Sequence, residues 1–189
     1  MSPEQDPHLL KVEVAELPDV ARISSLLQAN SADHGGMLMG HWSPDVIRDR
    51  ISNGQAIVMA TEGQQLLGVL LTQDKSYGDA LPVRAMLTAW PGRPDAYVYG
   101  PVCITEQARG RGILAALYAQ LKRVYPSREA ILFVREDNPR SLKAHLRLGM
   151  HEVARYRLDD ATFIVLSDRS ELTDPPPGPD GPAPADTRF

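Results

Sequence analysis

One short stretch limits the possible folds of this chain more than any other. Residues 107–113 read Gln-Ala-Arg-Gly-Arg-Gly-Ile. An extended apolar run at 97–104 precedes them, and a segment with apolar residues at helical spacing follows at 114–123. The pattern predicts that a strand ends, a loop with two glycines turns the chain, and a helix begins.

The predicted loop has the chemistry of an anion site. The first N–H groups of a helix have no partner within the helix and carry partial positive charge. Gly110 and Gly112 lack the Cβ atoms that would keep a phosphate away from the backbone, and Arg109 and Arg111 add full charges. We therefore expect a phosphate or pyrophosphate ligand here.

The bulk properties exclude several classes of protein. A length of 189 residues predicts one domain with a sizeable core. The net charge of -4 argues against a protein built to bind nucleic acid or an anionic membrane. Cys103 is the only cysteine, so an internal disulfide and a multi-cysteine metal site are excluded. With no signal-peptide pattern and no apolar run near the roughly 20 residues of a membrane span, we expect a cytoplasmic protein.

Hydrophobic patterns and turn residues predict the remaining elements. Strands are expected at 10–14, 56–60, 66–71, 131–134, 153–158 and 162–166. Helices are expected to begin at Pro18, after a Ser43 cap and after an Asn138 cap. The segment 72–95 has poor periodicity and is compatible with an extra strand or a short helix. Residues 1–8 are interpreted as a flexible lead-in, 9–169 as the folded domain and 170–189 as a Pro-rich disordered tail.

Two blocks of sequence resemble one family. The pattern Gln107-x-x-Gly110-x-Gly112, between a strand and a helix, is similar to the acyl-CoA signature of the GNAT superfamily of N-acyltransferases. A second block, from Asn138 to a helix that ends at Gly149, resembles the last segment of that family. The resemblance implies an α/β (α+β) fold: a mixed, twisted sheet of six to seven strands flanked by helices, with two strands splayed at an acyl-CoA groove.

Two other interpretations of the glycines compete with this one. Gly110-x-Gly112-x-x-Ala115 also fits a relaxed dinucleotide fingerprint, which favours an NAD(P)-binding oxidoreductase. That fold needs several further strand–helix units, and the chain has room for one helix and one hairpin before its tail. A glycine turn that only closes a packed helix is the simplest alternative.

The resemblance also implies the ligand and its contacts. Acetyl-CoA is the expected co-substrate, with no metal. Backbone N–H groups of residues 109–113 would hold the pyrophosphate, and the pantetheine arm would run between the strands at 97–104 and 131–134. The residues expected to bind the cofactor are Val102, Cys103, Ile104, Gln107, Ala108, Arg109, Gly110, Arg111, Gly112, Ile113, Asn138 and Ser141.

His145 is the candidate general acid. It occupies the place where many relatives have a Tyr that protonates the departing thiolate, and imidazole can donate a proton near neutral pH. The alternative is a helix residue that takes no part in proton transfer. The general base is unknown, because the position of the Glu found in protein-acetylating relatives holds Ala96.

The acceptor pocket has only weak candidates. They are loop or strand residues that would either contact substrate or belong to the loop surface and core: Asp33, His34, His41, Trp42, Tyr97 and Tyr99. Cys103 raises a route through an acyl-enzyme, but no His or carboxylate adjoins it in the sequence.

The sequence thus predicts an N-acetyltransferase that moves an acetyl group from acetyl-CoA to a primary amine, by direct attack in a ternary complex. A small-molecule amine is preferred to a peptide amine, with no nucleic acid or membrane partner and a homodimer left open. A non-catalytic acyl-CoA sensor with the same groove is the alternative from another functional class.

Overall fold

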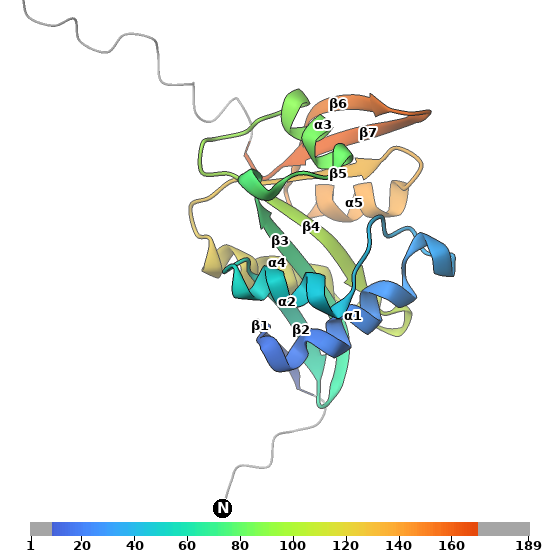
Figure 1. Cartoon of the computed structure of the whole chain (residues 1–189), viewed down its shortest axis with the longest axis vertical. Coiled ribbons are helices and arrows are strands. Elements are labelled where there is room, and N and C mark those ends of the chain that lie inside the picture. The colour runs from blue at the N-terminus through green and yellow to red at the C-terminus, as the bar shows by residue number, and fades with distance from the viewer. Residues whose placement is uncertain (1–8, 170–189) are drawn as a thin grey trace, which may run out of the picture.

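The computed structural model describes residues 9–169, so the predicted lead-in and Pro-rich tail lie outside the described part. Seven strands form one sheet in the order β1-β2-β3-β4-β5-β7-β6 (Figure 1). They are β1 (Leu10–Val14), β2 (Ile57–Glu62), β3 (Gln65–Asp74), β4 (Tyr97–Ile104), β5 (Ala130–Arg135), β6 (His151–Leu158) and β7 (Ala161–Ser167). The helices are α1 (Val20–Ala29), α2 (Pro44–Ser52), α3 (Leu81–Ala89), α4 (Ile113–Val124) and α5 (Pro139–Arg147).

The sheet is mixed, as expected from the sequence. All neighbouring strands pair antiparallel except β4 and β5, which are parallel. After α4, only β5, α5 and the β6–β7 hairpin follow, so the repeated strand–helix units of a dinucleotide-binding fold are missing from residues 9–169. The oxidoreductase alternative is therefore wrong on topology.

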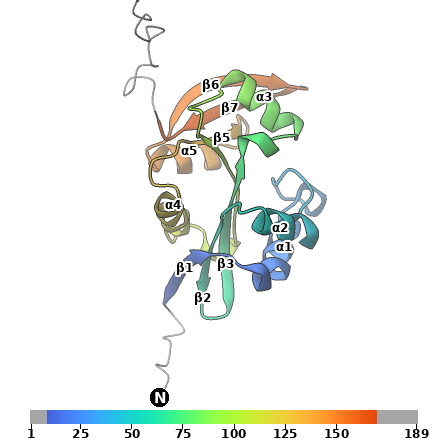
Figure 2. The same ribbon diagram turned by 60° about the vertical axis from the view of Figure 1, so that its left-hand side comes forward.

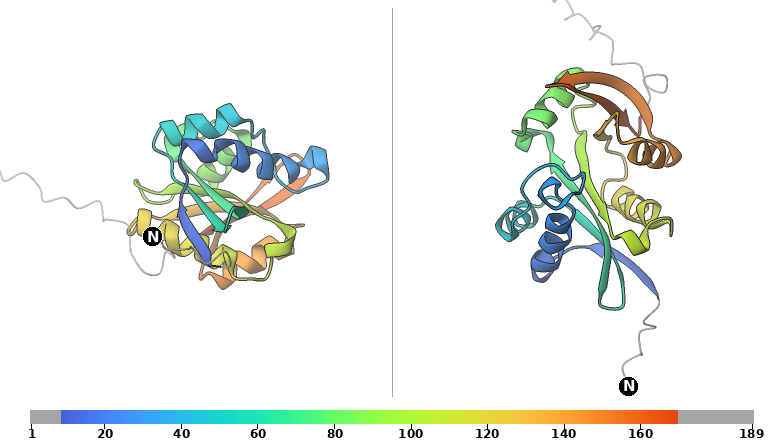
Figure 3. Two further views of the ribbon diagram at one scale, coloured as in Figure 1. Left: turned by 90° about the horizontal axis from the view of Figure 1, so that it is seen from below. Right: turned by 90° about the vertical axis from the view of Figure 1, so that its right-hand side faces the viewer.

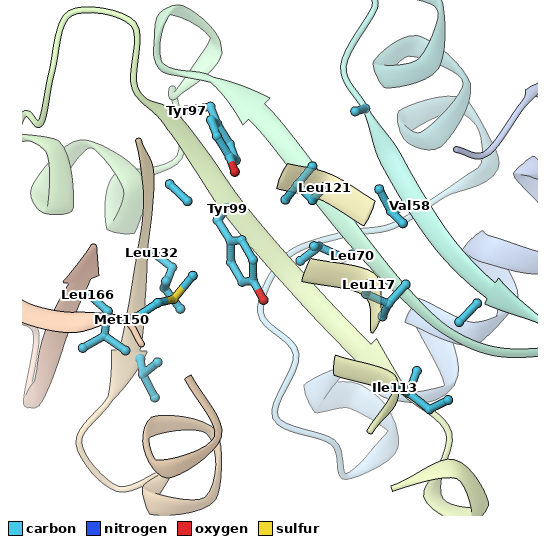
Figure 4. Packing of buried hydrophobic residues seen from close by; sticks show 14 of the residues in the cluster. Val58, Leu70, Tyr97, Tyr99, Ile113, Leu117, Leu121, Leu132, Met150 and Leu166 are labelled. Carbon is cyan, nitrogen blue, oxygen red and sulfur yellow. The ribbon is translucent and has the colours of Figure 1, made fainter. Parts of the chain in front are cut away.

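Helices cover both faces of the sheet. Helices α4 and α5 lie on one face, and α1, α2 and α3 lie on the other, with the sheet edge-on between them (Figures 2 and 3). On the first face, Leu117 and Leu121 of α4 pack in one cluster with Leu70 and Tyr99 (Figure 4). On the second face, residues of α1 and α2 pack against β2 and β3, and Met86 of α3 packs against β4, β5 and β7.

Local sequence explains where the helices begin. The Ser43 hydroxyl accepts a hydrogen bond from the Val46 N–H (3.4 Å), and the Asn138 side chain accepts one from the Ser141 N–H (3.1 Å). In both helices a proline fills the first helical position, where a missing N–H costs nothing. Both predicted caps are confirmed.

Of the two structures that the sequence left open for the segment 72–95, an extra strand or a short helix, the helix is present. Strand β3 extends to Asp74, and α3 then spans Leu81–Ala89. The buried carboxylate of Glu129 ties the end of this segment to the sheet, because it accepts hydrogen bonds from the Trp90 indole (3.0 Å), the Arg93 N–H (2.6 Å) and the Ser167 hydroxyl (2.6 Å). α3 is thereby fixed over the β5–β7 end of the sheet.

Strands β4 and β5 separate soon after they begin. They pair only at Tyr97 with Ala130 and at Val98 with Ile131. β4 also has a bulge against β3 at Gly100 and Pro101, a residue pair that favours such an irregularity. The predicted splay is confirmed, and it opens the sheet near its centre.

Within the described residues, no helix combines the length and apolar character that crossing a bilayer requires.

Candidate active site

A large cleft lies where β4 and β5 part. Its volume is about 1220 Å³, larger than the roughly 300–1,000 Å³ of an ordinary small-molecule pocket, so it has room for two ligands. Residues from both faces of the sheet line it. We call the part formed by the start of α4 and by α5 the α4 side. We call the part formed by residues 35–42, α2 and the start of α3 the α2 side.

The start of α4 presents free backbone donors to the cleft. Within residues 9–169, the N–H groups of Gly110 and of 112–115 donate to no acceptor, and these residues line the cleft. Gly110 and Gly112 both have a φ of +78°, a conformation that side chains other than glycine rarely adopt, and a Cβ at either would extend into open space. The predicted anion-binding geometry is present.

The donors differ slightly from the predicted set. The Arg109 N–H donates to the Glu106 carbonyl (3.2 Å) and the Arg111 N–H to the Ala108 carbonyl (3.4 Å), so both are used within the loop. The Arg111 guanidinium pairs with Glu62 (2.7 Å) outside the cleft lining. Gln107 is exposed and does not line the cleft either, whereas Ala108 and Arg109 do.

The gap between β4 and β5 offers further main-chain donors. The Thr105 N–H donates to the Leu67 carbonyl of β3 (2.8 Å). Because successive N–H groups along a strand point to opposite sides, the Cys103 N–H also faces β3, and those of Val102 and Ile104 face the gap. The gap therefore has the backbone donors to bind an extended ligand; binding of the pantetheine arm by Val102 and Ile104 stays a prediction.

The cleft is lined by cations without anions. Among residues 9–169, no Asp or Glu lines it, although the whole chain has a net charge of -4. The cationic lining residues are Arg50, Arg109, Arg135, Arg140, Lys143 and Arg147. All except Arg50 lie on the loop before α4, at the end of β5 or on α5. The α4 side suits a ligand with several phosphate charges.

Comparison with known proteins identifies the fold. The model of the acetyltransferase (GNAT) family matches residues 24–150, which include both sequence blocks described above. The chain belongs to the GNAT family of acetyltransferases. Comparison with curated protein sequences gives no match.

Solved structures with this fold have little sequence identity to the chain. The structure of yncA from Salmonella typhimurium with its cofactor acetyl-CoA is 14% identical, covers 90% of this chain and 98% of its own, and has a TM-score of 0.63. The Escherichia coli ribosomal-protein-S18-alanine N-acetyltransferase is 15% identical, with 84% and 92% covered and a TM-score of 0.60. NAA60 of Arabidopsis thaliana in complex with acetyl-CoA is 12% identical, with 84% and 97% covered and a TM-score of 0.59.

In this GNAT domain, His145 lies at the inner end of the α4 side. Its ring is 5% exposed, and its Nδ1 lies 2.8 Å from the Ser141 carbonyl oxygen. A carbonyl oxygen only accepts, so Nδ1 holds the proton and Nε2 has a free lone pair. Burial lowers the pKa of His145, and the bond to Ser141 opposes this only in part. The ring is therefore neutral at pH 7, with Nε2 as a proton acceptor.

Nε2 is buried and has no hydrogen-bond partner within the described residues. The Tyr99 ring lies edge-on to the imidazole, with 5.4 Å between the ring centroids, and its buried hydroxyl is also without a partner there. Unpaired buried polar groups cost stability, so two beside one cleft indicate a ligand or water contact. Asn138 and Ser141 line the cleft with them, and their contact with the cofactor stays a prediction.

Tyr97, a candidate for the acceptor pocket with a core position as its alternative, lies outside the cleft lining. Its side chain is 1% exposed and packs against Tyr125 and below Arg128, with 4.8 Å between the two tyrosine ring centroids. Asp33 and His34 are exposed in a turn and do not line the cleft either. His41 and Trp42, from the same loop, do line it.

Cys103 lines the cleft as a protonated thiol. Desolvation raises the pKa of Cys103 to about 11, and its Sγ lies 3.8 Å from the Leu26 carbonyl oxygen. A thiol with this pKa is a poor nucleophile at neutral pH, which argues against an acyl-enzyme. The described residues also contain no group of three or more His, Cys, Asp or Glu that could hold a metal ion.

Sequence reasoning missed Arg50, the one cation of the α2 side. It follows the inward-facing Val46 by one helical turn, and this spacing was the available signal.

Proposed function

We propose that the chain is an N-acetyltransferase that transfers the acetyl group of acetyl-CoA to a primary amine of a small molecule, in a ternary complex. The observation that supports this best is a cleft that passes through the sheet. Its α4 side has phosphate-binding character, and its α2 side is apolar and aromatic. Two ligands entering from opposite faces would meet at the β4–β5 gap. The acetyl-CoA complexes of yncA and NAA60 support the choice of co-substrate.

In this proposal the α4 side holds acetyl-CoA. The free N–H groups at the start of α4 bind the diphosphate, and the cationic side chains of α5 and the neighbouring loops balance its charge. The N–H groups of Val102 and Ile104 bind the pantetheine arm. One of them can also stabilise the oxyanion that develops on the thioester carbonyl.

The transfer needs a proton acceptor and then a proton donor. The ammonium loses a proton, the amine nitrogen bonds to the thioester carbon, the carbon–sulfur bond breaks, and the thiolate takes up one of the two protons released. The described lining contains two histidines, His41 and His145, and His145 is the buried one. We propose that Nε2 of His145 accepts a proton from the attacking amine and returns it to the thiolate.

A small acceptor is supported by the surroundings of β4. The place of the carboxylate used by protein-acetylating relatives holds Ala96, which is 2% exposed. Buried apolar surface on the α2 side, Trp42 above all, suits a compact acceptor better than an extended basic peptide.

The test is a screen of amines, amino acids and peptides for release of free CoA thiol, together with calorimetry of acetyl-CoA binding. We expect acetyl-CoA to bind and at least one small amine to release thiol. Binding without thiol release from any acceptor would indicate a sensor and contradict the proposed activity. No acetyl-CoA binding would contradict both.

A further inference from the structure

Arg50 is a half-buried cation on the side of the cleft opposite the phosphate-binding residues. It lies on α2, on the face of the sheet away from α4 and α5 (Figure 2). Its guanidinium donates to the Thr72 carbonyl (3.0 Å) and the Gln73 side chain (3.0 Å), and it lies over the Trp42 ring, 5.3 Å from the centroid. These contacts fix the position of the guanidinium at the wall of the cleft.

The charge of Arg50 has no counter-ion in the described part of the chain. Its hydrogen-bond acceptors there are neutral: Thr72, Gln73 and, at 3.5 Å, Gln55. Two arginines of the neighbouring turns are paired instead, Arg22 of α1 with Asp19 and Arg48 of α2 with Asp45. Burial lowers the pKa of Arg50, as expected for a desolvated cation with no anion beside it. Such a charge is costly unless a ligand supplies the anion.

The charges of the acceptor restrict its chemical class. The transferred group goes to an amine that arrives as an ammonium, and no carboxylate among residues 9–169 lines the cleft to receive it. A simple cationic amine would thus face the positive charge of Arg50, the one Lys or Arg in the described lining of the α2 side. A zwitterion would not meet this repulsion, because it brings its own negative charge.

We infer that the acceptor is an amine that also bears a carboxylate, of the α-amino acid type, and that Arg50 binds this carboxylate. Arg50 is then the residue that determines acceptor specificity. The inference rests on the proposed function, since it names the substrate class of the same site. A guanidinium held in a fixed plane matches a carboxylate through two parallel hydrogen bonds. The apolar residues beside it, Val46 and Trp42 among them, favour an apolar amino acid side chain.

The inference is tested with matched acceptors. Each L-amino acid of an apolar series is compared with its α-amide and its decarboxylated amine, for example leucine, leucinamide and 3-methylbutylamine. We expect kcat/KM for the carboxylate to exceed that for either neutral partner by about 10- to 100-fold, the range for a hydrogen-bonded charge. A preference for the amide, the simple amine or a polyamine overturns the inference.

Substitutions on α2 distinguish a role of Arg50 in acceptor specificity from a general loss of activity or stability. Arg50→Gln is expected to lower kcat/KM for the amino acid about 10- to 100-fold and to change it less than about threefold for the amide, with an unchanged acetyl-CoA affinity. Arg50→Lys keeps the charge and should retain part of the preference if the substituted protein melts like the original. Arg48→Gln, an exposed position on the same helix, is the matched control and should change nothing. Equal losses for acid and amide in Arg50→Gln contradict the proposal.

A binding measurement keeps the inference independent of catalysis. Calorimetry of the CoA-saturated protein with N-acetyl-leucine and N-acetyl-leucinamide compares the two products without turnover. Tighter binding of the carboxylate, lost in Arg50→Gln, supports the inference even if no amine releases thiol and the proposed activity fails. Equal binding, or no binding of either, overturns it.

Discussion

The two sides of the cleft differ in the groups that they offer to a ligand: main-chain donors on one side and a side chain on the other. On the α4 side, the cleft presents main-chain N–H donors at the start of one helix and along one strand, together with exposed cations. On the α2 side, the described lining has a single Lys or Arg side chain, Arg50, which is held by β3 and Trp42. A backbone site is specified by a few consecutive residues. A side-chain site depends on how distant segments pack, so it can change its ligand by a single substitution.

The largest expected effect comes from His145, which lies between the two sides. His145→Phe fills the same space without a proton acceptor and should lower kcat by about 100-fold or more, the lower end for general acid–base catalysis. Acetyl-CoA affinity, measured by calorimetry, should stay within about twofold, because the phosphate contacts are elsewhere. An unchanged kcat would remove His145 from the mechanism and leave the junction of the two sides without a proton acceptor.

Gly112 tests the backbone character of the α4 side. Gly112→Val forces a branched side chain into a positive φ and into the space in front of the free N–H groups. Loss of one or more charge-assisted hydrogen bonds should weaken acetyl-CoA binding roughly 10- to 100-fold.

Gly54→Val is the matched control for this prediction. Gly54 has a similar φ of +72°, also has open space at its Cβ position, and lies outside the cleft lining. Both variants should lose similar stability, on the order of 1–2 kcal/mol in thermal or denaturant unfolding, because both strain the backbone. Equal acetyl-CoA affinity in the two variants would show that the start of α4 does not bind the diphosphate.

The pH dependence distinguishes an acceptor from a donor at His145. Burial places the pKa of His145 below its ordinary 6.5, so Nε2 is free at neutral pH and protonated only in acid. If Nε2 accepts the proton, the ratio of wild-type kcat to His145→Phe kcat is constant above the pKa and falls about tenfold per pH unit below it. If His145 begins as the acid, the ratio falls as pH rises instead. Using the ratio removes the titration of the amine itself, so the sign of the slope decides the role.

The same contrast explains what the sequence could predict. The α4 side was predictable because residues 107–113 and Asn138 act through local turns and caps, whose conformation follows from the nearby residues. The loop before α2 was not, because His41 and Trp42 face the cleft while Asp33 and His34 face solvent. That difference comes from a turn and from a bridge between Ser31 and Leu38, for which the sequence has no periodic signal.

Arg50 is the clearest example of a site residue that the sequence could not predict. Its position on α2, four residues after Val46, predicts that it faces inward, whereas an arginine is usually found at the surface. Its place at the cleft follows from hydrogen bonds to the end of β3, more than twenty positions later in the chain. The tautomer of His145, by contrast, is set within one helical turn by Ser141, but which ring nitrogen faces the cleft depends on the packing of α5 against the sheet.

The smallest effect is expected at Cys103, which lies in the gap where both sides meet. Burial keeps its thiol protonated, and in the described residues the one hydrogen-bond partner of the thiol is the Leu26 carbonyl, which is not a base. Direct transfer from thioester to amine needs no such nucleophile, so Cys103→Ala should keep kcat within about twofold while costing some stability through the small cavity it leaves. Mass spectrometry of the protein with acetyl-CoA and no acceptor should find no acetylated enzyme. A stable acetyl-enzyme, or a large loss of kcat in the variant, would contradict direct transfer. The acetyl group would then pass first to Cys103 and only afterwards to the amine, so the two ligands would not need to be bound at the same time.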